Sequence, residues 1–113
     1  MTGNILVIGA LGQVGSELVE NLRAKYGENN VVAADIKEEG PSGLYEKLDI
    51  LDKDALRAIV DKYEIKNIFN LVALLSATAE KHVDYAWQLS IDGHFNILNL
   101  AKDKVIEKIF WPS

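Results

Sequence analysis

A glycine pattern directly after an apolar run constrains the fold more than any other feature of this sequence. The run is Ile5–Ile8, and the seven residues after it read G-x-x-G-x-x-G. Four consecutive apolar residues are typical of a strand buried on both faces, as in a parallel sheet. In such a turn Gly9 lets the chain leave the strand sharply, Gly12 lets backbone amides approach a pyrophosphate, and Gly15 lets the following helix pack closely. The pattern therefore predicts a dinucleotide site, because the start of a helix offers free N–H groups and a positive dipole end to phosphates.

An acidic residue at the end of a second apolar run supports this interpretation. Val31–Asp35 reads as a short strand, and Asp35 follows the glycines by about twenty residues, as the dinucleotide-binding pattern requires. A carboxylate there accepts hydrogen bonds from the adenosine ribose and repels a 2′-phosphate, which favours NAD over NADP even though Lys37 lies nearby. The alternatives are a glycine-rich connection that binds nothing and a solvated acid at the end of a strand.

Apolar residues at helical spacing follow the glycine turn. We expect a helix over residues 13–26 whose sheet-facing stripe consists of four residues: Val14, Leu18, Val19 and Leu22. Further strands are expected at 48–50, 65–72 and 109–111, and further helices at 53–63 and 85–102, the first of these capped by Asp52. Alternating strands and helices with short links imply right-handed crossovers. The expected fold is an α/β Rossmann-type parallel sheet of order 3-2-1-4-5 with helices on both faces.

Size and composition limit what such a domain can do. With 113 residues, the chain is expected to form one NAD-binding domain over residues 1–113, without a separate substrate domain. A net charge of −5 argues against nucleic-acid and acidic-membrane partners, and neither a signal peptide nor a membrane-spanning run is expected. The absence of cysteine excludes disulfides, thiolate metal sites and a cysteine nucleophile, and it fits a cytoplasmic protein. No metal site is expected, since His82 and His94 lie too far apart for a helical metal pair.

Taken together, the motifs of this chain resemble those of the extended short-chain dehydrogenase/reductases. Within that superfamily the chain most resembles the NAD-dependent L-threonine 3-dehydrogenases. The segments that carry the resemblance are Gly9–Gly15, Asp35, Leu48–Ile50, the A-L-L-S-A loop at 73–77 and the F-W-P-S run at 110–113. It covers essentially the whole chain, but only the N-terminal part of such an enzyme.

The resemblance implies a set of cofactor-binding residues. Asp49 would accept a hydrogen bond from the adenine amino group, Ile50 would pack on the adenine ring, and Leu71 and Ala73 would line the nicotinamide-side ribose. The implied NAD contacts are Gly9, Leu11, Gly12, Gln13, Val14, Gly15, Asp35, Ile36, Asp49, Ile50, Leu71 and Ala73.

Two serines match substrate-side positions of the same enzymes. Ser76 matches a serine that contacts the amino-acid substrate, although a loop hydroxyl that bonds the local backbone is an equally good interpretation. Ser113 matches the first residue of the P-S-[ST] signature, whose next hydroxyl is the usual catalytic partner. No catalytic residue is expected within the chain, because none of its four tyrosines has a lysine four residues further on. In the Y-x-x-x-K pair, the lysine lowers the tyrosine pKa so that tyrosinate can remove the substrate proton.

Three functions stay open from the sequence. The leading one is the NAD-binding part of an oxidoreductase that passes hydride from the β-carbon of L-threonine to NAD, giving 2-amino-3-oxobutanoate; this chain alone is expected to bind NAD weakly without turnover. The others are part of a nucleotide-sugar epimerase or dehydratase, and a non-catalytic NAD-binding module or redox-sensing regulator. Self-association or a homodimer is also expected, because a fifth strand at the sheet edge leaves Ile109 and Phe110 poorly covered.

Overall fold

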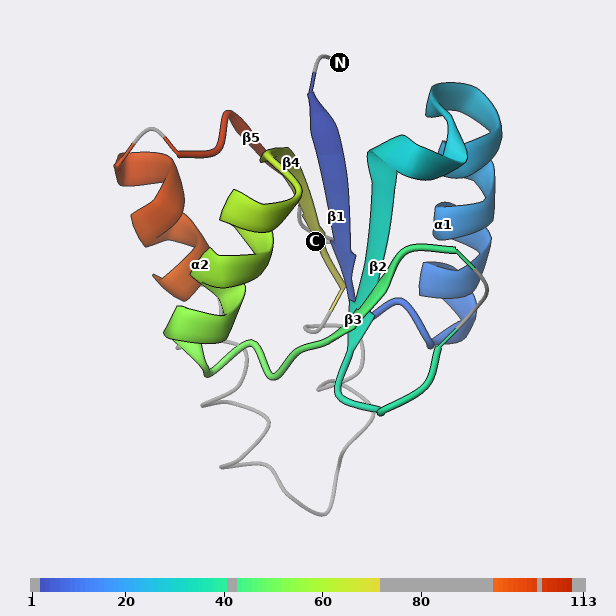
Figure 1. Cartoon of the computed structure of the whole chain (residues 1–113), viewed down its shortest axis with the longest axis horizontal. Helices are drawn as coiled ribbons and strands as arrows, with labels where there is room; N and C mark the ends of the chain where they lie inside the picture. Colours follow the sequence, from blue (N-terminus) through green and yellow to red (C-terminus); the bar gives the residue numbers. More distant parts are fainter. Residues whose placement is uncertain (1–2, 41–42, 72–94, 104, 111–113) are drawn as a thin grey trace.

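Five parallel strands form the centre of the part of the chain that the structure describes. A computed structural model describes residues 3–40, 43–71, 95–103 and 105–110. The strands are, in chain order, β1 (Asn4–Ile8), β2 (Val31–Asp35), β3 (Tyr45–Lys47), β4 (Ile65–Asn70) and β5 (Lys108–Phe110). They lie side by side in the order β3-β2-β1-β4-β5, and every neighbouring pair is parallel (Figure 1). The predicted α/β fold and strand order are therefore confirmed.

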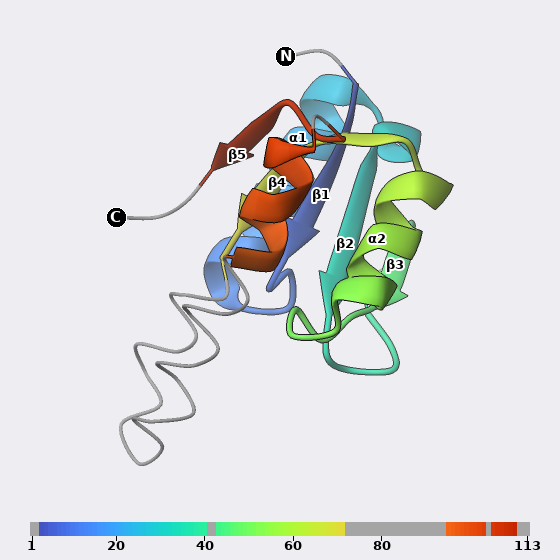
Figure 2. The ribbon, with the colours of Figure 1, turned by 90° about the vertical axis from the view of Figure 1, so that its left-hand side faces the viewer.

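Helices cover both faces of this sheet, which explains the uninterrupted apolar run of β1. Helix α1 (Gln13–Tyr26) packs on one face, while α2 (Lys53–Lys62) and the helical residues 95–102 pack on the other (Figures 1 and 2). Ile5 and Val7 of β1 point toward α1, and Leu6 and Ile8 point toward α2. Because successive strand residues alternate between faces, a strand covered on both sides needs apolar residues at every position.

The third strand differs from the prediction. It comprises Tyr45–Lys47 and not Leu48–Ile50. The ladder starts where Ala33 N–H donates to Leu44 O (2.9 Å), and it closes where Leu48 N–H donates to Asp35 O (2.7 Å). Leu48 and Ile50 are buried in the α2-side core after the strand has ended, so their apolar character reflects core packing. The true strand is polar because it forms an edge of the sheet, where charged residues discourage pairing with other chains.

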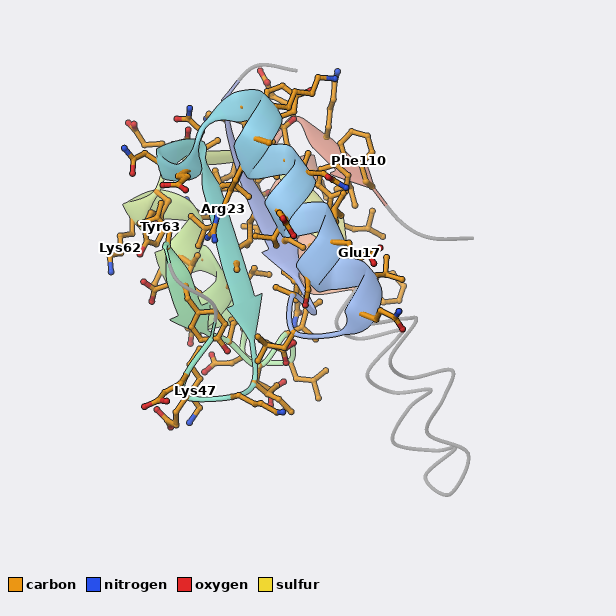
Figure 3. The ribbon with its side chains drawn as sticks, turned by 90° about the vertical axis from the view of Figure 1, so that its right-hand side faces the viewer. Glu17, Arg23, Lys47, Lys62, Tyr63 and Phe110 are labelled. Atoms are coloured by element: carbon orange, nitrogen blue, oxygen red, sulfur yellow. The ribbon has the colours of Figure 1, made fainter. Side chains whose placement is uncertain are left out.

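The start of α1 also differs in one respect. The helix has the predicted bounds, but its buried residues are Gly15, Val19 and Leu22, while Val14 is 54% exposed. The sheet-facing stripe is therefore shifted by one residue at the first turn. Further along α1, the Arg23 guanidinium lies over β2 (Figure 3) and donates to Val31 O (3.3 Å) and Leu44 O (2.7 Å). Burial lowers the pKa of Arg23, against the opposing effect of Glu28.

Helix α2 begins as predicted from the sequence. The side chain of Asp52 accepts a hydrogen bond from Ala55 N–H (3.1 Å), which satisfies one donor that the first turn leaves unpaired. The predicted strand over 65–72 is observed as Ile65–Asn70, and the predicted strand over 109–111 as Lys108–Phe110. Residue 72, most of the helix predicted over 85–102, and residue 111 fall outside the described ranges. None of the helices in the described ranges combines the length and apolarity needed to cross a membrane.

Candidate functional site

The glycine turn lies at the carboxyl edge of the sheet, at the point where the strand order reverses. It connects β1 to α1, and β1 pairs with β2 on one side and with β4 on the other. In Figure 1 this is the lower edge of the sheet, where α1 begins. Ligands of open parallel sheets bind in the crevice at such a reversal. The predicted dinucleotide turn therefore has the position that the chemistry requires.

The first half of the turn is bonded to the end of β2. The backbone N–H groups of Gly9 and Ala10 both donate to Ala34 O, at 3.0 and 3.1 Å. The next N–H group, that of Leu11, donates to Asp35 Oδ2 at 2.9 Å. Gly9 has a φ of 85°, a conformation that L side chains rarely adopt, which is why glycine is needed where the strand ends.

The second half of the turn leaves its amides open. Helical bonding starts only at Ser16, whose N–H donates to Gly12 O (2.9 Å). The N–H groups of residues 13–15 have no acceptor within the described part of the chain. The first turn of α1 contains no acidic residue, and its N-cap, Gly12, makes no side-chain cap. A helix start with free donors, no carboxylate and no capping side chain is suited to an anion.

Gly15 brings the helix into direct contact with the turn. A Cβ at this position would lie 2.3 Å from Gly9 O and 2.8 Å from Ala10 Cα, both of them backbone atoms. This confirms that the third glycine is required for close packing. Ser16 strengthens the same contact, since its Oγ donates to Gly12 O (2.8 Å) and to Ala10 O (3.3 Å).

Asp35 is a buried carboxylate, which rules out the solvated strand-end acid considered above. The residue is 8% exposed, and its second oxygen, Oδ1, accepts from Ile36 N–H at 2.7 Å. Ile36 itself is 65% exposed, just beyond the strand. Two other groups hold the following segment: Tyr45 Oη donates to Lys37 O (2.6 Å), and Lys47 forms an ion pair with Glu38. Burial, together with the carboxylates of Asp35 and Glu38, raises the pKa of Tyr45.

The residues expected around adenine divide into an exposed one and a buried one. Asp49 is exposed, and its Oδ1 accepts from Leu51 N–H (3.0 Å). Ile50 is 2% exposed and packs in the α2-side core, so its side chain offers no surface on which a ring could stack. The expectation that Ile50 packs on adenine is therefore not supported by its position. The reason is that the chain turns into the core at this residue.

Of the residues expected near the nicotinamide and the substrate, the structure places one. Leu71 is buried at the end of β4, and its N–H donates to Ile8 O (2.9 Å), which puts it beside the glycine turn. Ala73, Ser76 and Ser113 lie outside the described residues.

Sequence reasoning missed one residue that supports this edge of the sheet. Asn96 Nδ2 donates to Ile50 O (2.8 Å), so it ties helix 95–102 to the segment that carries Asp49. No local signal could have identified it, because the two partners are 46 positions apart in the sequence. Within the ranges that the structure covers, no group of three or more His, Cys, Asp or Glu side chains could hold a metal ion.

Comparison with known proteins agrees with this geometry. Residues 5–113 match the model of the NAD dependent epimerase/dehydratase family. An uncharacterized epimerase/dehydratase of Staphylococcus saprophyticus is 41% identical over 96% of this chain. The similar solved structures include two L-threonine dehydrogenases. The GalE-like L-threonine dehydrogenase of Cupriavidus necator in its holo form is 38% identical, with a TM-score of 0.90 over 97% of this chain. The L-threonine dehydrogenase of Clostridium difficile is 42% identical, with a TM-score of 0.89 over 98% of this chain.

The chain corresponds to only part of each of these longer proteins. The chain spans 35% of the length of the staphylococcal protein and 36% of each L-threonine dehydrogenase. The family model, in contrast, covers residues 5–113 of the chain, which include the glycine turn and Asp35. The resemblance to L-threonine dehydrogenases inferred from the motifs is confirmed at the level of sequence and fold. The chain belongs to the NAD dependent epimerase/dehydratase family.

Proposed function

We propose that this chain binds NAD across the carboxyl edge of its sheet, with the pyrophosphate on the first turn of α1. The observation that carries the proposal is the division of the turn amides. The N–H groups of residues 9–11 donate hydrogen bonds to the end of β2. The N–H groups of residues 13–15 have no acceptor in the described chain, and the first turn of α1, to which they belong, contains no acidic residue. Phosphate oxygens would satisfy these donors, and the helix dipole adds to the attraction.

The other residues of the proposed site are those that the resemblance to L-threonine 3-dehydrogenases implies. Gly9, Leu11, Gly12, Gln13, Val14 and Gly15 form the pyrophosphate turn. Asp35 accepts from the adenosine ribose, with Ile36 beside it and Asp49 toward the adenine. Leu71 and Ala73 would line the nicotinamide-side ribose, as the resemblance implies. Ile50 follows Asp49 in the chain and is buried in the α2-side core.

Selectivity for NAD over NADP is part of the proposal. The 2′-phosphate of NADP would have to approach the carboxylate of Asp35. A second carboxylate, that of Glu38, lies on the segment that follows. Of the two lysines near Asp35, Lys47 is paired with Glu38, while Lys37 is exposed two residues after Asp35. We propose that repulsion of a 2′-phosphate by the carboxylates of Asp35 and Glu38 outweighs attraction by Lys37.

In the complete protein, we propose that L-threonine is oxidised to 2-amino-3-oxobutanoate. NAD held by the glycine turn and Asp35 would take up the hydride from the β-carbon, and a general base would take up the hydroxyl proton. The sequence identity of 38–42% to L-threonine dehydrogenases supports this substrate class. The resemblance of the motifs implies that Ser76 and Ser113 lie on the substrate side. This chain alone is proposed to be inactive, because its sequence contains no Y-x-x-x-K pair. The second candidate is a non-catalytic NAD-binding module.

Calorimetric titration of the chain with NAD and, separately, NADP tests the cofactor proposal. We expect NAD to bind and NADP to bind at least about tenfold more weakly, since one repulsive charged contact is worth on the order of 1.4 kcal/mol or more. Absence of NAD binding, or equal affinity for NADP, would contradict it.

The substrate proposal needs a complete enzyme. A chimera in which residues 1–113 replace the matching third of the C. difficile enzyme should reduce NAD in the presence of L-threonine, whereas the isolated chain should not. A chimera that folds and binds NAD but does not respond to L-threonine would favour the non-catalytic module.

A further inference from the structure

One buried carboxylate joins the end of β2 to the glycine turn. Three consecutive N–H groups of the turn donate to β2, and two of them use a backbone acceptor, Ala34 O. The third, that of Leu11, uses the side chain of Asp35. The same carboxylate also accepts from Ile36 N–H, so both of its oxygens are engaged by the backbone. Asp35 is therefore part of the framework of the turn before any ligand binds.

We infer that Asp35 is a positioning residue for the glycine turn in addition to its proposed contact with the ribose. This inference rests on the proposed function, because it concerns how the same site binds a diphosphate. Leu11 is the last residue that β2 holds before the chain reaches Gly12, the N-cap of α1. Its N–H bond fixes the direction in which the chain enters the helix. The direction of the helix determines how the N–H groups of residues 13–15 are oriented toward a bound anion.

The carboxylate has the capacity for both tasks. It offers about four lone-pair positions, of which the backbone bonds of Leu11 and Ile36 occupy two. The others are available to the hydroxyl groups of a ribose. The Asp35 carboxylate would thus bind the ribose and also stabilise the conformation of the turn that binds the diphosphate.

This double role predicts an effect of opposite sign from that of a simple ribose contact. If Asp35 only contacts the ribose, its removal does not weaken the binding of a diphosphate that lacks the ribose hydroxyls. The affinity would stay the same or rise, because a negative charge near an anion disappears. If Asp35 also positions the turn, its removal weakens binding of the same ligand, because the open amides lose their alignment.

The test compares ADP with 2′,3′-dideoxyadenosine diphosphate, which lacks the ribose hydroxyls. Affinities are measured by calorimetry for the wild-type chain, Asp35→Ala and Asp35→Asn. Asp103→Asn serves as the charge-matched control, because Asp103 is exposed and lies in the connection between helix 95–102 and β5. We expect Asp35→Ala to lower the affinity for the dideoxy ligand about tenfold, because one hydrogen bond to a charged group contributes on this scale. Asp35→Asn, with a single acceptor oxygen for two N–H groups, should fall between that variant and the wild type.

Amide exchange measured by NMR without ligand gives an independent result. In Asp35→Ala the Leu11 amide should exchange faster, while the Gly9 and Ala10 amides keep Ala34 O as acceptor and stay protected. Dideoxy-ADP affinity in Asp35→Ala equal to or above that of the wild type, or an unchanged Leu11 exchange rate, would overturn the positioning role. Failure of the wild type to bind NAD and ADP would instead overturn the proposed function, so the two failures are distinguishable.

Discussion

Replacing Gly15 by alanine tests how closely α1 is docked on the turn that is proposed to hold the pyrophosphate. The new Cβ would lie 2.3 Å from Gly9 O, and ordinary contact begins near 3.4 Å, so the helix and the turn must separate by about 1.1 Å. The neighbours cannot yield easily, because they are backbone atoms and the turn is bonded to Ala34 and Asp35. Overpacking of this kind costs roughly 1–3 kcal/mol, and each stretched hydrogen bond about 1 kcal/mol more.

Helix propensity acts in the other direction. Alanine in place of glycine within a helix normally stabilises by about 1 kcal/mol. The net expectation for Gly15→Ala is therefore a loss of roughly 1–3 kcal/mol in the free energy of unfolding.

Urea unfolding followed by circular dichroism measures this loss. Ala24→Gly, at an exposed position of the same helix, is the matched control and should lose only about 1 kcal/mol. The preference between glycine and alanine should thus reverse between two positions of one helix. A Gly15→Ala variant as stable as the wild type would refute the close contact.

Two further predictions concern the two ends of α2, on the other face of the sheet. Asp52→Ala should lower the free energy of unfolding by about 1 kcal/mol, because it removes the acceptor of Ala55 N–H, whereas a change within about 0.2 kcal/mol would contradict the cap. Tyr63→Phe should reduce the acid sensitivity of the fold, as followed by urea midpoints across a pH series. The hydrogen bond from Tyr63 (2.5 Å), and secondarily Lys62, holds the pKa of Glu46 below its ordinary value of 4.5. The stability that this provides is complete above pH 4.5 and is lost as the pH falls through the lowered pKa, so the difference between wild type and variant should shrink on acidification. A difference that stays constant with pH would refute this, and Tyr26→Phe is the control.

The parts of the fold that local chemistry determines were predictable from the sequence. The bounds of α1, the strand Val31–Asp35 and the cap at Asp52 depend on apolar spacing and on one short-range hydrogen bond. The strand order followed from the alternation of strands and helices, because right-handed crossovers leave few arrangements.

The parts that depend on distant contacts could not be predicted in this way. Leu48 and Ile50 looked like a strand because they are apolar, yet they owe that character to the core beneath α2. Val14 fits the helical stripe by spacing alone, but the docking of Gly15 on the turn rotates it into solvent. The bond from Leu11 to Asp35 spans 24 positions and gives no local signature, so only the folded chain reveals it.

Chemical-shift mapping by NMR tests most directly whether NAD binds at the glycine turn. On titration of the isotope-labelled chain with NAD, the amide signals of Gln13, Val14 and Gly15 should shift together with that of Ile36. Signals of Glu64 and Lys66, at the amino edge of the sheet, should stay in place. Shifts confined to the amino edge, or none at saturating NAD, would contradict the proposed site.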